Sequence, residues 1–226
     1  MKAAQQYEQY KTRLQRIADL RNASALMQWD QETYLPPKGA TLRGQQISTL
    51  SELSHQLFVE EELGSLLNDL AAKDDLDPWQ KRNVERTLED YNKSKKYTSE
   101  FVRALSDQVN KSFHAWIDAR KQNRFSIFQP ELDKLIALKK QETELLGFEQ
   151  HPYDALLDEY EKGSTVALLD KTFSGIIPVL KELTQEISSR PQVDDSFLQQ
   201  VFPKQKQWEW GMHLVKQLNF DFEAGR

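Results

Sequence analysis

The sequence contains no cysteine among its 226 residues, and only eight glycines and eight prolines. The absence of cysteine excludes disulfides, cysteine-ligated zinc sites and cysteine nucleophiles, and it fits the reducing cytoplasm, where we expect the protein to be. No apolar run approaches the length of about 18 residues that a membrane span requires. The polar residues 1–16 also lack the apolar region of a secretory signal. We therefore expect no membrane partner.

Motifs of several enzyme classes are missing as well. The four histidines are His55, His114, His151 and His213, and none is followed by glutamate, so the chain contains no HExxH zinc motif. It also lacks the glycine-rich phosphate loops and the GxSxG serine elbow. From the residues alone we predict no catalytic residue and no metal ligand in this chain. We expect His55 and His213 on or near the surface and His114 partly buried.

The charge balance is acidic, with a net charge of -5 and a pI near 5.5. Lysine and arginine are spread along the chain instead of forming the basic patch typical of nucleic-acid binding, so we expect no nucleic-acid partner. Hydrophobic residues make up 38% and charged residues 29% of the chain. This composition predicts a folded protein whose helices each keep a solvated face.

The hydrophobic periodicity is helical along the whole chain, and alternation typical of strands is nearly absent. Asp77 followed by Pro78 is a strong helix start, and Gly147 marks a helix end. The pattern predicts an all-α fold of about eight or nine mostly long, antiparallel helices. We expect them at 3–34, from 38, around 63–70, from 78, at 99–120, 130–147, 152–161, 165–189 and from 203.

The end of the first predicted helix combines an aromatic residue with acids. Trp29 lies beside Asp30 and one turn before Glu32. The group could form a cleft wall that contributes a carboxylate. The interpretation we favour is a core tryptophan, with a flanking acid that caps the next helix or forms a salt bridge to Lys38 or Arg43.

A second acidic group follows His151. Asp154 and Asp158 share one helix face at i, i+4, and Asp158 and Glu161 share one at i, i+3, so basic partners are expected from another helix. Paired carboxylates can perform acid–base chemistry or hold a cation. We favour a structural charge network, because no calcium-binding spacing is present.

Four segments, in this order, resemble the carboxypeptidase Taq family of zinc metallocarboxypeptidases. They are ALMQWDQETYLPPKGATLRGQQISTLSELSH (25–55), HAWIDARKQNRFSIFQPELDKLIALKKQE (114–142), HPYDALLDEYEKGST (151–165) and FDFEAGR (220–226). Two local departures are Arg124, where the family pattern has an acidic residue, and Lys162, where it has proline.

The resemblance implies that residues 1–226 are the N-terminal helical segment of a longer metallocarboxypeptidase, forming one side of a cleft-forming helical metallopeptidase fold. The parent enzyme would use zinc, or cobalt in its place, would cleave C-terminal residues from peptides, and would form a homodimer. The segment itself would bind no metal and be inactive without the missing C-terminal catalytic half. An alternative is a free-standing helical interaction module. Positions in the matching segments give candidate substrate-groove residues: Trp29, Asp30, Glu32, Arg43, Tyr153 and Asp154.

Overall fold

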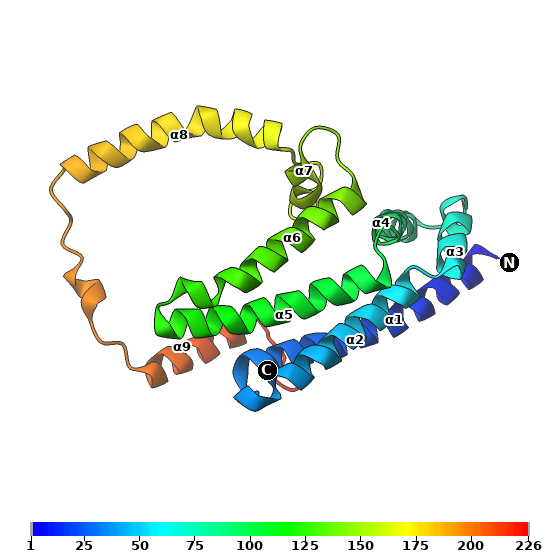
Figure 1. The fold of residues 1–226 in the computed structure, drawn as a ribbon, viewed down its shortest axis with the longest axis horizontal. Coiled ribbons are helices and arrows are strands. Elements are labelled where there is room, and N and C mark those ends of the chain that lie inside the picture. Colours follow the sequence, from blue (N-terminus) through cyan, green and yellow to red (C-terminus); the bar gives the residue numbers. More distant parts are fainter. Residues whose placement is uncertain (1, 226) are drawn as a thin grey trace. The chain divides into compact units, whose positions relative to one another are not determined.

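The computed structural model describes residues 2–225, and within them it contains nine α-helices and no β-strand. This confirms the predicted all-α class and the number of helices (Figure 1). Three short 3-10 helices, at Pro37–Gly39, Phe125–Ile127 and Ser196–Gln199, join them. The α-helices are α1 (Ala3–Thr33), α2 (Ala40–Phe58), α3 (Glu61–Ala71), α4 (Pro78–Ser94), α5 (Ser99–Gln122), α6 (Gln129–Leu146), α7 (Pro152–Leu157), α8 (Val166–Ser189) and α9 (Lys204–Gln217).

Local signals set several of these helix boundaries. Asp77 and Gln80 form a reciprocal capping box at the start of α4, with Pro78 at the first helical position. This arrangement satisfies backbone N–H groups that have no partner inside the helix. At the end of α6, Gly147 adopts a φ of 75°, a conformation that glycine adopts at little cost. Both boundaries agree with those predicted from the sequence.

The chain divides into two compact units, residues 1–169 and 170–226. In the first unit, α1 packs against α2, α2 against α5, and α5 against α6 (Figure 1). The short helices α3 and α4 pack together, and α3 also contacts α1. The long helices therefore form neighbouring pairs, as expected for an α-helical bundle.

The hydrophobic core of the first unit lies where α1, α3 and α4 meet. Four side chains there, Leu63, Leu67, Leu70 and Val84, are completely buried. Aromatic residues complete this core: Tyr7 and Tyr10 from α1, Phe58 from α2 and Tyr91 from α4. Burying each such side chain stabilises the fold by about 1.5–3 kcal/mol before entropy is counted.

The buried side of α5 differs from the apolar stripe that its sequence indicates. Phe101 is buried, but Val109 and Trp116 are about half exposed. Gln108 and Ser112 are buried in their place because the start of α6 offers them hydrogen bonds. The Gln108 side-chain nitrogen donates to the Glu131 carboxylate at 2.8 Å, and both residues donate to the Glu131 carbonyl at 3.1 Å.

The second unit consists of α8 from residue 170 onward, the 3-10 helix at Ser196–Gln199, and α9. Apolar residues recur on α8 at i, i+3, i+4 and i+7, and each is 45–57% exposed. We call them the α8 apolar row: Phe173, Ile176, Ile177, Leu180, Leu183 and Ile187. Even with this row, no helix within residues 2–225 is long and apolar enough to cross a membrane.

The packing of α3 on α4 depends on a small residue at Gly64. A Cβ atom added there would lie 2.3 Å from the Tyr91 hydroxyl oxygen and 2.5 Å from its ring. We predict that Gly64→Ala destabilises the first unit by about 1–3 kcal/mol, because the buried ring has to shift. Chemical denaturation followed by circular dichroism measures this change.

Gly175 in α8 is the matched control, because a Cβ added there meets nothing within 4 Å. Gly175→Ala should raise stability by about 0.5–1 kcal/mol, since alanine favours the helix. Equal effects of the two substitutions would contradict the close contact between Gly64 and Tyr91.

Candidate functional site

The end of α1 and the start of α2 form a charged corner. The Arg43 guanidinium donates to the Asp30 carboxylate at 2.5 Å and to the Met27 carbonyl at 3.0 Å. Both charged side chains are about one-fifth to one-third exposed. The predicted salt bridge from Asp30 to Arg43 is thereby confirmed, and it fixes the turn that contains Pro36 and Pro37.

Two further candidate groove residues border this corner. Trp29 is 43% exposed and packs edge-on against Tyr34, with ring centroids 5.5 Å apart. Glu32 is exposed on the last turn of α1. The favoured core position of Trp29 is therefore wrong, because the ring packs on Tyr34 at the helix end and presents one side to solvent. The role of Trp29 and Glu32 in a substrate groove stays a prediction.

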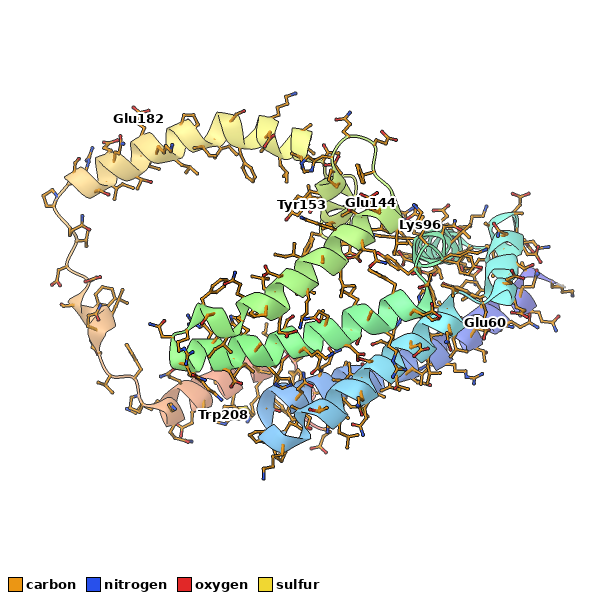
Figure 2. The ribbon with its side chains drawn as sticks, in the orientation of Figure 1. Glu60, Lys96, Glu144, Tyr153, Glu182 and Trp208 are labelled. Carbon is orange, nitrogen blue, oxygen red and sulfur yellow. The ribbon has the colours of Figure 1, made fainter. Side chains whose placement is uncertain are left out.

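The second group of candidates lies on α7. Asp154 accepts hydrogen bonds from the backbone N–H groups of His151 at 3.3 Å and Val166 at 2.8 Å. Its carboxylate thus joins the first turn of α7 to the first turn of α8. Tyr153 is 54% exposed beside it, and Figure 2 labels this residue on α7.

Helix α7 is shorter than the predicted 152–161, because Asp158 binds the turn that follows. The Asp158 carboxylate accepts from the Gly163 N–H at 3.0 Å and pairs with Lys93 of α4 at 3.4 Å. The Gly163 N–H, and then Lys93, lower the pKa of Asp158 below its ordinary value. This basic partner from another helix is the one that the acidic pattern of the segment predicted.

Lys162 and Glu89 form a second link between the α7 turn and α4. The Lys162 ammonium group is the main reason why the pKa of Glu89 is lowered, and Arg86 contributes through its charge. The structure thus gives the lysine that departs from the family pattern a partner on α4.

A large cavity of about 1250 Å³ opens between α4, the end of α6 and α7. Asp154, Asp158 and Lys162 line it, together with Lys93 and Lys96. The Lys96 ammonium group donates to the Leu146 carbonyl at 2.5 Å, and both residues line the cavity. Figure 2 labels Lys96 and Glu144 near this end of α6.

A buried pair beside this cavity was not predicted from the sequence. The Tyr97 hydroxyl donates to the Glu142 carboxylate at 2.9 Å, and Glu142 is only 3% exposed. Lys139 pairs with the same carboxylate. Burial, followed by the nearby Glu142 charge, raises the pKa of the Tyr97 hydroxyl. No local sequence pattern distinguishes Glu142 from the exposed acids around it, so only the tertiary structure identifies it.

One of the four histidines, His151, lies within the group of candidates on α7. His55 is 8% exposed, so its predicted surface position is wrong. This residue of α2 is buried because the Tyr97 carbonyl, in the segment before α5, lies 3.1 Å from its Nε2 and offers it a hydrogen bond. His114 is partly buried, as predicted, and His151 caps α7 by accepting from the Tyr153 N–H at 3.1 Å. His213 is exposed, as predicted.

The predicted groove residues therefore form two groups, one at the α1–α2 corner and one on α7. Within residues 2–225, no contact or cavity described above joins them. The same part of the chain contains no group of three or more histidine, aspartate or glutamate side chains placed to hold a metal ion.

The chain is similar to one family of metallopeptidases along most of its length. The model of the family described as "Carboxypeptidase Taq (M32) metallopeptidase" matches residues 9–226. Carboxypeptidase 1 of Bacillus subtilis is 34% identical over 94% of the chain, which covers 43% of that protein. Thermostable carboxypeptidase 1 of Pyrococcus furiosus is 30% identical over 96% of the chain, which covers 44% of that protein.

Solved structures show the same fold. A crystal structure of a protein named BsuCP matches with a TM-score of 0.92 at 31% identity, over 98% of this chain and 45% of the other. The M32 carboxypeptidase from Deinococcus radiodurans matches with a TM-score of 0.78 at 30% identity. The match covers 96% of this chain and 44% of the other. The present chain therefore spans less than half the length of these relatives.

We predict that Asp158→Asn changes how the stability of the first unit depends on pH. The pKa of Asp158 is lower in the folded state, so its charge stabilises the fold above the ordinary value of 3.8. That contribution is lost as the pH falls through the folded pKa. The variant should be less stable at neutral pH and show a shallower loss of stability as the pH falls below the ordinary value of 3.8.

Thermal unfolding measured across this pH range tests the prediction. Glu161→Gln removes a neighbouring carboxylate whose side chain is exposed, and it should leave the pH dependence close to that of the unmodified chain. Identical pH profiles for Asp158→Asn and the unmodified chain would show that Asp158 does not hold the turn.

Proposed function

The chain belongs to the carboxypeptidase Taq (M32) metallopeptidase family, and on this basis we propose that it is the N-terminal part of a longer zinc-dependent carboxypeptidase. The proposed reaction is hydrolysis of the last peptide bond of a peptide by a metal-activated water. The observation that carries the proposal is that two curated carboxypeptidases match 94–96% of this chain, but only 43–44% of their own length.

The residues of this chain do not fit the catalytic metal site. The 226 residues contain no HExxH sequence, and residues 2–225 place no three possible ligands together. Zinc, or cobalt in its place, would therefore be held by the remainder of the longer protein. We propose that this segment alone is inactive, and we assign no step of the reaction to its residues.

The role proposed for this segment is to form one wall of the substrate groove. Trp29, Glu32 and Tyr153 are exposed and could contact a peptide. Asp30 and Arg43 would support Trp29 through their salt bridge, and Asp154 would hold the α7–α8 junction. In the longer protein we further propose a homodimer, while the cytoplasmic location stays a prediction from composition.

Expression of two forms of the protein tests the proposal. We expect the reading frame to continue beyond Arg226 into an HExxH motif, and the longer protein loaded with zinc to release C-terminal residues from peptides. The 226-residue chain should release none. A stop codon directly after Arg226, or peptide release by this chain with one bound zinc, would contradict the proposal.

A second candidate function is a free-standing helical interaction module. The α8 apolar row favours it, because exposed apolar patches of this kind often mark contact surfaces. The two candidates differ in the partner that covers the row. In the first it is the remainder of the same protein, and in the second it is a separate protein.

Substitution of Trp29 tests the proposed groove in the longer protein. We predict that Trp29→Ala raises KM for peptides about two- to twelvefold with little change in kcat, as expected for the loss of one aromatic contact. Steady-state kinetics with a short peptide measures both constants.

Trp79→Ala is the control, since Trp79 is 81% exposed on α4 and outside the proposed groove. It should leave KM unchanged. Equal effects of the two substitutions, or a lower kcat with unchanged KM for Trp29→Ala, would argue against a groove position.

We also predict that the 226-residue chain self-associates through the α8 apolar row. Replacing Ile177 and Leu180 by glutamate adds charge to the row and should reduce the mass measured by light scattering to that of the monomer, 26.4 kDa. Gln185→Glu with Ser189→Glu adds the same charge on the opposite side of α8 and should have no such effect.

Association that survives the substitutions in the row would show that another surface is responsible. A chain that is monomeric without any substitution would contradict the prediction and favour autonomous folding.

A further inference from the structure

A second, smaller cavity of about 370 Å³ lies between α1 and α2, bordered by the end of α4 and by α5. Arg21, Ser24 and Gln28 of α1 line it at i, i+3 and i+7, so they share one face of that helix. Ser51, Ser54, His55 and Phe58 line it in the same way from α2. Two long helices thus face each other here through polar side chains instead of the apolar contacts usual between packed helices.

The side chains around this cavity include an arginine but no carboxylate. The chain as a whole has a net charge of -5, so a cavity lined by a basic group without an acid differs from its average composition. Three lining residues also border the larger cavity near α7. Two acids of that larger cavity have basic partners: Glu89 pairs with Lys162, and Asp158 pairs with Lys93.

Arg21 is positioned to bind an anion. Its guanidinium carbon lies 5.1 Å from the centroid of the Phe58 ring, so the aromatic ring supports one face of the group. No ion pair to Arg21 occurs in the described part of the chain. A guanidinium stacked in this way keeps its N–H groups free for two parallel hydrogen bonds to an oxyanion.

The serines around the cavity divide into two kinds. The hydroxyl groups of Ser51 and Ser54 already donate to the carbonyls of Ile47 and Ser51, each at 3.0 Å. The hydroxyl groups of Ser24 and Ser94 make no hydrogen bond to any residue between 2 and 225, although Ser24 is only 8% exposed. Neither hydroxyl oxygen is among the fully buried polar atoms without a partner, so both can be reached by a ligand in the cavity.

His55 lines the cavity as a neutral side chain. Its Nε2 lies 3.1 Å from the Tyr97 carbonyl, which can only accept, so this nitrogen carries a proton. Burial lowers the pKa of the imidazole, and the Arg21 charge lowers it further, so the ring is neutral around pH 7. Arg21 is thus the only charged group among the residues that line the cavity.

We propose that this cavity binds one small oxyanion, such as phosphate or the carboxylate of a small molecule, through Arg21 with Ser24 and Ser94. The arginine would supply the charge and paired N–H donors, while the two free hydroxyls would donate to the remaining oxygens. Every residue named in this proposal belongs to the first unit. The inference therefore does not depend on peptidase activity and would stand if the proposed function failed.

Equilibrium dialysis of the 226-residue chain against radiolabelled inorganic phosphate, at pH 7 and constant ionic strength, tests the proposal. We expect saturable binding of one phosphate per chain. Arg21→Gln should weaken this binding at least tenfold, and Ser24→Ala should weaken it less, because a neutral donor contributes less than a charged one.

Arg16→Gln is the matched control. Arg16 is an exposed arginine of the same helix that does not line the cavity, and its replacement removes the same charge. This variant should bind phosphate like the unmodified chain. Circular dichroism establishes that each variant is folded, and Ser24→Ala provides an independent test if Arg21→Gln unfolds.

Three outcomes would overturn the proposal. They are the absence of saturable phosphate binding, binding of many phosphates per chain with no plateau, and equal weakening by Arg16→Gln and Arg21→Gln. The last would show that phosphate responds to the overall charge of α1 and not to this cavity.

Discussion

The first unit depends on one constraint, which is that polar side chains buried between its long helices must find hydrogen-bond partners. An unpaired buried polar group costs about 1–3 kcal/mol, so each such group restricts how two helices can slide or rotate. Gln108 and Ser112 of α5 satisfy the requirement at Glu131 of α6. Ser48 of α2, which is completely buried, lies 3.3 Å from the Ser106 hydroxyl of α5. These contacts fix the register of α2, α5 and α6, while the apolar core at α1, α3 and α4 supplies the larger share of burial.

The same constraint explains why the two ends of α1 differ. Its first half places Tyr7 and Tyr10 in the core, where the Tyr10 hydroxyl lies 2.8 Å from that of Thr87 on α4. Its second half faces α2 with smaller and more polar residues, and Ser24 lies there without a hydrogen-bond partner in residues 2–225. Small polar residues on both helices leave a space that close-packed leucines would fill. The cavity beside Arg21 is therefore a consequence of the polar faces that α1 and α2 turn toward each other.

Sequence patterns predicted those features that arise from local interactions. The start of α4 at Asp77 and Pro78 follows from capping, and the salt bridge of Asp30 with Arg43 joins residues separated by one short turn. Features that depend on partners distant in the sequence were harder to predict from it. The buried side of α5 includes Gln108 because its hydrogen bonds to Glu131 compensate for burying a polar residue, and that partner lies on another helix. His55 was placed on the surface because nothing near it in the sequence reveals that the Tyr97 carbonyl contacts it.

The charged residues of the candidate site are mostly engaged with one another. Asp154 accepts two backbone N–H groups, Asp158 holds Gly163 and Lys93, and Glu142 is bound by Tyr97. The pKa of Asp158 is lowered by the Gly163 N–H and by Lys93, so this carboxylate is poorly suited to exchange protons near neutral pH. These contacts fix the position of α7 against α4 and α6 within the first unit. They support a structural role for this segment in the proposed peptidase, in which the groups that activate water come from the part of the protein that the relatives possess beyond this match.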